Sequence, residues 1–265
     1  MLHRPQSAEN IGAAARAMKN FGLARLSVVA PRSWSGAPRT GGAASAAGDV
    51  MDRARRMARR ASDLLDAVEV YPDLAGALGA ATWTCGTTSR ALPGRPRLHP
   101  RELATEVTRR SASGEVAIVF GEERRGLSDA ELGLCQAVCT IPTAPAYDSM
   151  NLAQAVAVVG WEIAGAPEVV PAEPPPEPAR HATVEALWDR LAALLAATGF
   201  TNPQNPDHIL ADLRRLLARA DPSQREVELL VAAIRSVERL LRAPETAADQ
   251  DRKPGMVPGE DPSRS

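Results

Sequence analysis

Residues 116–161, VAIVFGEERRGLSDAELGLCQAVCTIPTAPAYDSMNLAQAVAVVGW, alternate apolar runs with polar loops and helix starts. The run Val116–Phe120 is short, apolar and partly β-branched, which is typical of a strand buried on both faces. A polar segment with a glycine at each end, Gly121–Gly126, follows at once. Ser128 is placed to cap the next helix, because acidic residues stand in its first turn, where they meet the positive end of the helix dipole.

The same order is repeated further along this stretch. A second apolar run, Val138–Ile141, is stopped by Pro142, and a polar loop then leads to a helix that Asp148 or Ser149 can cap. The apolar side chains of that helix recur at three- and four-residue steps, at Leu152, Val156, Val159 and Ile163. Strand, loop, helix, strand, loop and helix predict a parallel α/β layer. Both polar loops leave carboxyl ends of strands, where such sheets bind ligands.

Three segments of the chain resemble the motifs of a known superfamily. FGEERRGL and YDSMNLAQAV are similar to the second and third motifs of the SPOUT superfamily of RNA methyltransferases. NIGAAARAMKNFGL resembles its first motif, with Asn10, Gly12 and Arg16 at the matching positions. Within the superfamily the resemblance is closest to the TrmJ group. It implies an α/β parallel sheet with a C-terminal trefoil knot. Periodicity and spacing do not indicate the knot.

The resemblance also implies an activity and a site. The expected reaction is methylation of the ribose 2'-hydroxyl of an anticodon-loop pyrimidine in tRNA, with S-adenosylmethionine as the donor. Arg16 and Ser149 would act in catalysis, with Asn10 and Asn151 as organisers of the site. The positions matching the donor contacts of the family are Thr87, Thr88, Ser89, Gly121, Ile141, Asp148, Ser149 and Met150.

Each of these residues also has an ordinary structural explanation. Small hydroxyl residues after a glycine, as at Thr87–Ser89, make common turns. Asparagines at loop–helix junctions often bond their own backbone, so capping is the alternative for Asn10 and Asn151. Gly121 lacks a Cβ, which would let a ligand approach the backbone closely. Glu123 has no evident role, and pairing with an arginine, Arg16 or Arg124, is as reasonable as substrate contact.

Arg16 is our candidate for the main catalytic group. A guanidinium has a pKa above about 12, so it stays protonated and is a poor general base. We expect Arg16 to bind the phosphate beside the target ribose and to stabilise the developing alkoxide, with the proton passing to Ser149 or water. Without the resemblance, the favoured interpretation would be a surface arginine on an alanine-rich helix.

Composition narrows the class of protein. The 265 residues are 45% hydrophobic and 24% charged with a net charge of -1, ordinary values for a globular protein. No apolar run is long enough to span a membrane and no signal peptide is evident, so we expect a cytoplasmic protein without membrane contact. Cys85, Cys135 and Cys139 lack metal-ligand spacing and are expected to be buried thiols, so no metal site is predicted. Arginines cluster near residues 53–60 and 214–219, either as an RNA-binding surface or as solvated helix faces.

The chain divides into four segments. Residues 1–165 are the expected methyltransferase domain, 166–182 a proline-rich linker, 183–242 a helical extension and 243–265 a disordered tail. In the TrmJ group a full strand precedes the first motif, whereas only Met1–Arg4 precede it here. We therefore expect the true start to lie upstream, with a stunted first strand as the alternative. The resemblance further implies tRNA binding by the extension and a homodimer. The alternatives are a related enzyme acting on rRNA or another tRNA nucleotide, and a noncatalytic RNA-binding relative.

Overall fold

The computed structural model describes residues 1–31, 44–90, 92, 97–167, 176–201 and 206–242. The predicted tail, and residues 168–175 of the predicted linker, lie outside these residues. The strands are β1 (Leu2–His3), β2 (Ser27–Val29), β3 (Glu69–Tyr71), β4 (Trp83–Thr87), β5 (Arg97–Leu98), β6 (Val116–Val119) and β7 (Ala137–Cys139). The helices are α1 (Ala8–Asn20), α2 (Ala44–Ala58), α3 (Ser62–Asp66), α4 (Leu74–Leu78), α5 (Pro100–Ser111), α6 (Asp129–Gly133), α7 (Leu152–Gly165), α8 (His181–Ala197), α9 (Pro206–Ala220) and α10 (Gln224–Arg242), with a 3-10 turn at Arg59–Ala61.

The strands form a parallel layer. One group has the order β1-β2-β3 and the other β5-β7-β4-β6, and every pairing is parallel. The two groups meet where the His3 amide donates to the Phe120 carbonyl at 2.8 Å and the Phe120 amide donates to the Met1 carbonyl at 3.0 Å. The predicted α/β class is confirmed, and the first strand is two residues long, lying between β2 and the end of β6.

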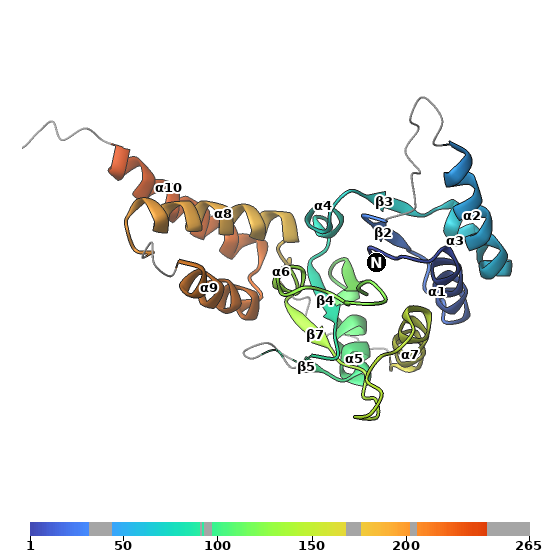
Figure 1. Ribbon diagram of the computed structural model, residues 1–265. Helices are drawn as coiled ribbons and strands as arrows, with labels where there is room; N and C mark the ends of the chain where they lie inside the picture. The colour runs from blue at the N-terminus through green and yellow to red at the C-terminus, as the bar shows by residue number, and fades with distance from the viewer. Residues whose placement is uncertain (32–43, 91, 93–96, 168–175, 202–205, 243–265) are drawn as a thin grey trace, which may run out of the picture.

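Helices cover both faces of this layer (Figure 1). Alternate strand residues point to opposite faces, so Val28 and Val29 belong to different apolar clusters. The larger cluster lies under α1, α2, α5 and α7, and the smaller lies under α4 and α6. The predicted parallel-layer pattern of residues 116–161 is therefore realised as β6, α6, β7 and α7.

Helix α1 packs closely on α2 because its glycine has no side chain. A Cβ at Gly12 would lie 2.0 Å from the carbonyl oxygen of Ala54. Contacts this short do not occur in folded proteins, so any larger residue would force the two helices apart. The glycine of the first motif therefore has a packing role that the sequence pattern did not reveal.

The three cysteines are buried and free, as predicted. Burial raises the pKa of the Cys139 thiol to about 12 and raises that of Cys85 well above its usual range. Both thiols are therefore protonated at neutral pH, which agrees with an unreactive packing role. In the described part of the chain, no helix combines the length and the apolar character that a membrane crossing requires.

Between β4 and α5, Arg97–Leu98 form β5 beside β7, and α5 begins at Pro100 with His99 as its cap. One local prediction is wrong. The cap of α7 is Asn151 rather than Asp148 or Ser149, because the Asn151 side chain accepts from the amides of Ala153 and Gln154 at 2.9 and 3.3 Å.

Helices α8, α9 and α10 form a separate unit beside the α/β layer (Figure 1). Their own core contains Ala179, Leu187, Val227 and Ile234. The unit joins the body where the His181 amide donates to the Ala81 carbonyl at 2.7 Å. Arg214 lies in this junction, donating to the Gly133 carbonyl at 3.4 Å and stacking over Trp188 at 5.4 Å. It is therefore engaged inside the protein rather than free on an RNA-binding surface.

Candidate functional site

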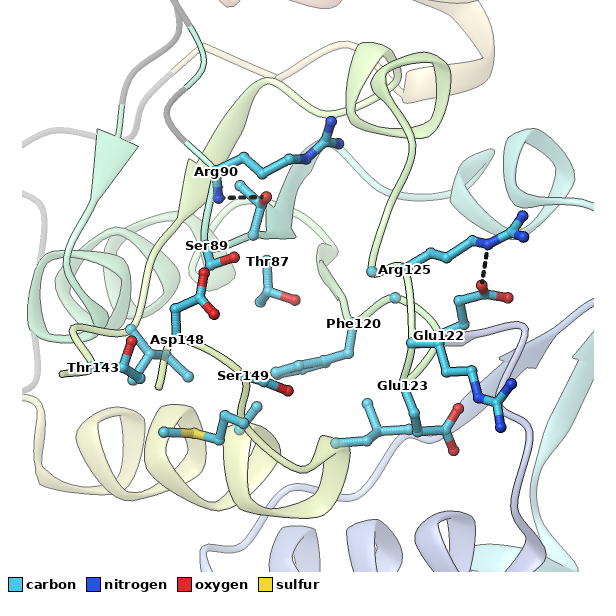
Figure 2. A pocket seen from close by; sticks show the side chains of 18 of the residues that line it. Thr87, Ser89, Arg90, Phe120, Glu122, Glu123, Arg125, Thr143, Asp148 and Ser149 are labelled. Carbon is cyan, nitrogen blue, oxygen red and sulfur yellow. Dashed lines mark hydrogen bonds and ion pairs between the residues drawn. The ribbon is translucent and has the colours of Figure 1, made fainter. Parts of the chain in front are cut away.

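A cavity of about 360 Å³ opens at the carboxyl ends of β4, β6 and β7. Three chain segments form its walls: the loop after β4, the loop after β6, and the segment between β7 and α7 (Figure 2). Its volume lies within the range of small-molecule sites, and its position is where parallel sheets bind ligands.

All eight positions expected to contact a donor line this one cavity. They come from all three walls, and they are Thr87, Thr88, Ser89, Gly121, Ile141, Asp148, Ser149 and Met150. The Thr87 hydroxyl donates to the Val119 carbonyl at 3.0 Å, and the Thr88 hydroxyl accepts from the Arg90 amide at 3.1 Å. These two hydroxyls therefore shape the loop, and their roles toward a ligand stay predictions.

Gly121 is required by the loop that contains it. A Cβ at this position would lie 2.3 Å from the carbonyl carbon of Gly126. Gly126 has a φ of +66°, a conformation that favours glycine, and its amide donates to the Glu122 carbonyl at 2.9 Å. The loop after β6 therefore folds back on Gly121, so this glycine has a packing role as well as a place on the cavity wall, and close approach of a ligand to its backbone stays a prediction.

Asn10, Glu123 and Asn151 form a brace beside the cavity. Glu123 accepts from the Asn10 side-chain amide at 2.9 Å and from the Gln6 backbone amide at 2.9 Å. The Asn151 side-chain amide donates to the Asn10 side-chain oxygen at 3.0 Å. The loop after β6 and the starts of α1 and α7 are thereby held together. Glu123 is bound at the start of α1 and not to Arg16 or Arg124, so the predicted arginine pairing is wrong, and contact with a substrate stays a prediction.

The two asparagines differ in their local role. Asn151 caps α7 with its side-chain oxygen and keeps its amide for Asn10. Asn10 does not cap α1, because the Ser7 hydroxyl accepts the Asn10 amide at 3.2 Å. Since Asn151 caps α7, Asp148 and Ser149 are not used as caps and lie on the cavity wall.

Arg16 does not line the cavity of its own chain. It lies on the exposed face of α1, whose buried face packs on α2 and α7. Among the described residues, no acidic side chain forms an ion pair with it. The structure therefore brings Ser149, Asn10 and Asn151 to the cavity or its brace, and leaves Arg16 outside.

Charged side chains of both signs surround the cavity. Arg90, Arg125, Glu122 and Asp148 stand around it (Figure 2), and Arg124 also lines it. Glu122 is only 8% exposed, and its carboxylate lies 4.0 Å from the Arg125 guanidinium, whose side chain is 86% exposed. The mouth can therefore receive a ligand that carries both positive and negative groups.

Several lining residues were not anticipated from sequence. They are Arg90, Phe120, Cys139, Thr143, Leu152 and Ala155, together with most of the loop after Gly121. Arg90 directly follows the predicted Thr87–Ser89 segment, so its position in the sequence could have indicated that it lines the cavity. Leu152 belongs to the apolar repeat of α7, which predicts a residue packed in the core but does not predict that it also lines the cavity.

Comparisons with known proteins agree with this geometry. The family described as SpoU rRNA Methylase matches residues 1–161, and the family described as tRNA methyltransferase TrmJ, C-terminal domain, matches residues 182–246. The fold and the cavity thus define a SpoU-type methyltransferase domain followed by a helical extension.

Individual relatives cover nearly the whole chain. A Pseudomonas aeruginosa TrmJ, described as a tRNA (cytidine/uridine/adenosine-2'-O-)-methyltransferase, is 35% identical over 248 residues, 88% of this chain and 90% of that protein. A Yersinia enterocolitica TrmJ, described as a tRNA (cytidine/uridine-2'-O-)-methyltransferase, is 34% identical over 251 residues, 91% of each chain. The crystal structure of TrmJ from Z. mobilis ZM4 superposes with a TM-score of 0.75 at 32% identity, covering 89% of this chain and 97% of that one. The chain belongs to the TrmJ group of the SpoU methylase family.

Proposed function

We propose that this protein methylates the ribose 2'-hydroxyl of a pyrimidine in the anticodon loop of tRNA, using S-adenosylmethionine. The relatives that cover about nine-tenths of the chain carry tRNA 2'-O-methyltransferase names. The observation that carries the proposal is that the eight expected donor contacts, scattered over residues 87–150, line a single cavity.

The residues present fit this donor. Ile141, Met150 and Leu152 give an apolar wall suited to an adenine ring, and Asp148 provides a carboxylate for hydroxyl or cationic groups. When bound, S-adenosylmethionine supplies an electrophilic methyl group on a sulfonium centre. The chain itself orients the two reactants, and holding reacting atoms near contact distance contributes several kcal/mol to catalysis.

Ser149 and Arg16 have complementary tasks in this proposal. Ser149 stands on the cavity wall, where its hydroxyl passes the proton of the 2'-hydroxyl to water. Arg16 holds the neighbouring phosphate and stabilises the developing alkoxide, because a guanidinium remains charged and presents several donors. Asn10 and Asn151 keep the start of α7, and hence Ser149, in place through the brace.

The position of Arg16 favours a homodimer in which this residue serves the cavity of the partner subunit. The exposed surface of α1 and α7 offers an interface, since the Trp161 side chain is 67% exposed and packs edge-on to Phe21 with ring centroids 6.1 Å apart. Exposed aromatic residues are enriched in protein interfaces.

We further propose a trefoil knot in the chain around residues 116–161 and a cytoplasmic location, where tRNA is modified. The close superposition on the Z. mobilis TrmJ supports the shared chain path. The alternatives are a methyltransferase acting on rRNA or another tRNA nucleotide, and a noncatalytic RNA-binding protein.

The deciding experiment maps ribose methylation across total RNA from a strain that lacks the gene. Loss of one 2'-O-methyl group in tRNA anticodon loops, restored by the wild-type gene, is the expected result. Loss in rRNA or at another tRNA position would support the first alternative. Donor binding by calorimetry without methyl transfer to any RNA would support the noncatalytic one.

A further inference from the structure

Arg90 connects two walls of the cavity. It lies in the loop after β4, directly after Ser89, and its guanidinium reaches across to the segment that follows the loop after β6. One terminal nitrogen donates to the Leu127 carbonyl at 2.6 Å, and the other lies 2.8 Å from the Asp129 carboxylate. Its backbone amide donates to the Thr88 hydroxyl at 3.1 Å, so the residue is also tied to its own loop.

Leu127, the residue that Arg90 contacts on the opposite wall, is buried and closely packed. The Leu127 side chain is 1% exposed, and a Cβ on Gly86 would lie 3.1 Å from it. The Leu127 amide lies under Gly121, at the point where the loop after β6 closes. Arg90 therefore joins the loop that carries Thr88 and Ser89 to a buried point of the opposite wall.

The two contacts of the guanidinium differ in strength. The side chains of Arg90 and Asp129 are 46% and 78% exposed, so water screens their ion pair and it contributes little. The bond to the Leu127 carbonyl is short and charge-assisted, and such bonds are about twice as strong as neutral ones. A lysine has one point charge instead of a planar fork and cannot reproduce both contacts.

We propose that Arg90 is a positioning residue that sets the spacing of the two donor-binding walls, acting on donor affinity and not on the transfer step. This inference rests on the proposed function. With Arg90 in place, the loop around Thr88 and Ser89 is pre-organised, so donor binding has less ordering entropy to overcome.

The test compares Arg90→Ala and Arg90→Lys with a matched control, Arg109→Ala. Arg109 is 45% exposed and pairs with Glu106 at 2.7 Å on α5, so its removal deletes a similar surface arginine that does not line the cavity. S-Adenosylhomocysteine affinity is measured by calorimetry, with KM for the donor, kcat at saturating donor and tRNA, and melting temperature.

Arg90→Ala is expected to weaken S-adenosylhomocysteine binding and raise the donor KM by about tenfold, with kcat changed less than about twofold. Arg90→Lys should retain part of the affinity for S-adenosylhomocysteine that Arg90→Ala loses. Asp129→Asn should lose little of this affinity, and Arg109→Ala should bind S-adenosylhomocysteine like the wild type. Unchanged affinity in Arg90→Ala, or a fall in kcat with an unchanged donor KM, overturns the proposal.

The design separates this inference from the proposed function. A wild-type protein that binds no S-adenosylhomocysteine overturns both. A wild-type protein that binds it, with Arg90→Ala equal to Arg109→Ala, overturns the Arg90 role alone. If Arg90→Ala does not fold, Arg90→Lys replaces it in the test. Affinity equal to wild type in Arg90→Lys would contradict the proposal that the guanidinium must contact both the Leu127 carbonyl and the Asp129 carboxylate.

Discussion

Asn151 donates its side-chain amide to the side-chain oxygen of Asn10 at 3.0 Å, across 141 residues of sequence. The Asn10 side-chain amide in turn donates to Glu123 at 2.9 Å, so Asn10 connects the first motif to both the second and the third. The three motifs are therefore one structural unit as well as three parts of a site.

The Glu123 carboxylate should stabilise the whole domain. Glu123→Ala leaves the amides of Gln6 and Asn10 without their acceptor, and hydrogen bonds to charged groups contribute about 2 kcal/mol each. We expect a loss of about 2–4 kcal/mol in the free energy of unfolding, measured by denaturant titration. Glu123→Gln retains an acceptor oxygen and should lose less. Equal stability of the alanine variant and the wild type would show that the brace contributes nothing.

Replacing Gly12 with alanine, which adds a single carbon atom, should destabilise the protein. Gly12→Ala places a Cβ against the Ala54 carbonyl and should lower stability by about 1–3 kcal/mol through separation of α1 and α2. Gly133→Ala is the control, because nothing lies within 4 Å of its Cβ position on α6. The control should be neutral or more stable by roughly 0.5–1 kcal/mol, since alanine favours helix. Similar melting temperatures for the two variants would contradict the packing role of Gly12.

Arg16 should act on turnover across the subunit boundary. Arg16→Ala is expected to bind S-adenosylhomocysteine like the wild type, because Arg16 does not line its own cavity, while methyl transfer falls steeply. Ser149→Ala should also be inactive.

Mixing the two inactive variants provides the decisive measurement. In mixed dimers the intact cavity of one subunit meets the intact Arg16 of the other, so about a quarter of wild-type activity should return at equal mixing. Activity that stays absent after subunit exchange, verified with differently tagged subunits, would place Arg16 in its own subunit's reaction or outside catalysis.

Trp161 should hold the proposed dimer together. Trp161→Glu introduces a charge into an apolar interface and is expected to give a monomer in light scattering, with activity lost together with dimerisation. Phe200→Glu is the control, because Phe200 is 58% exposed but lies just after α8 in the helical unit. A dimer that survives the Trp161 change would locate the interface elsewhere.

The helical unit should loosen at acidic pH. Burial lowers the pKa of His181 below its usual value of 6.5; Glu185 opposes this effect and Arg214 adds to it. The unfolded chain therefore takes up this proton at a higher pH than the folded chain. The stabilisation is complete above pH 6.5 and decreases as the pH falls below that value.

Melting curves of wild type and His181→Gln between pH 7.5 and pH 5.5 test this point. Glutamine does not titrate in this range, so we expect its melting temperature to fall less over the interval. A wild-type curve parallel to that of the variant would exclude His181 as the source of the pH dependence.

Local patterns predicted the elements of residues 116–161 well, because caps, helix repeats and proline stops act within a few residues. Ser128 caps α6 as expected, with Glu131 completing the capping box. The errors arose where several local solutions were equally good. Asp148, Ser149 and Asn151 are all competent caps, and only the packing of α7 selects Asn151. The two-residue strand β5 carries no repeat at all and exists because β7 offers it a partner.

The chain's own sequence determined the parallel α/β class, the helical extension, the buried thiols and the list of candidate donor contacts, since these follow from short-range patterns and motif identity. Tertiary structure alone decided that the eight candidates share one cavity and that Glu123 bonds Asn10. It also decided that Gly12 and Gly121 are required by backbone packing, and that Arg16 lies outside the cavity of its own chain. The reason is physical: such contacts join residues far apart in sequence, and only the completed sheet brings them within bonding distance.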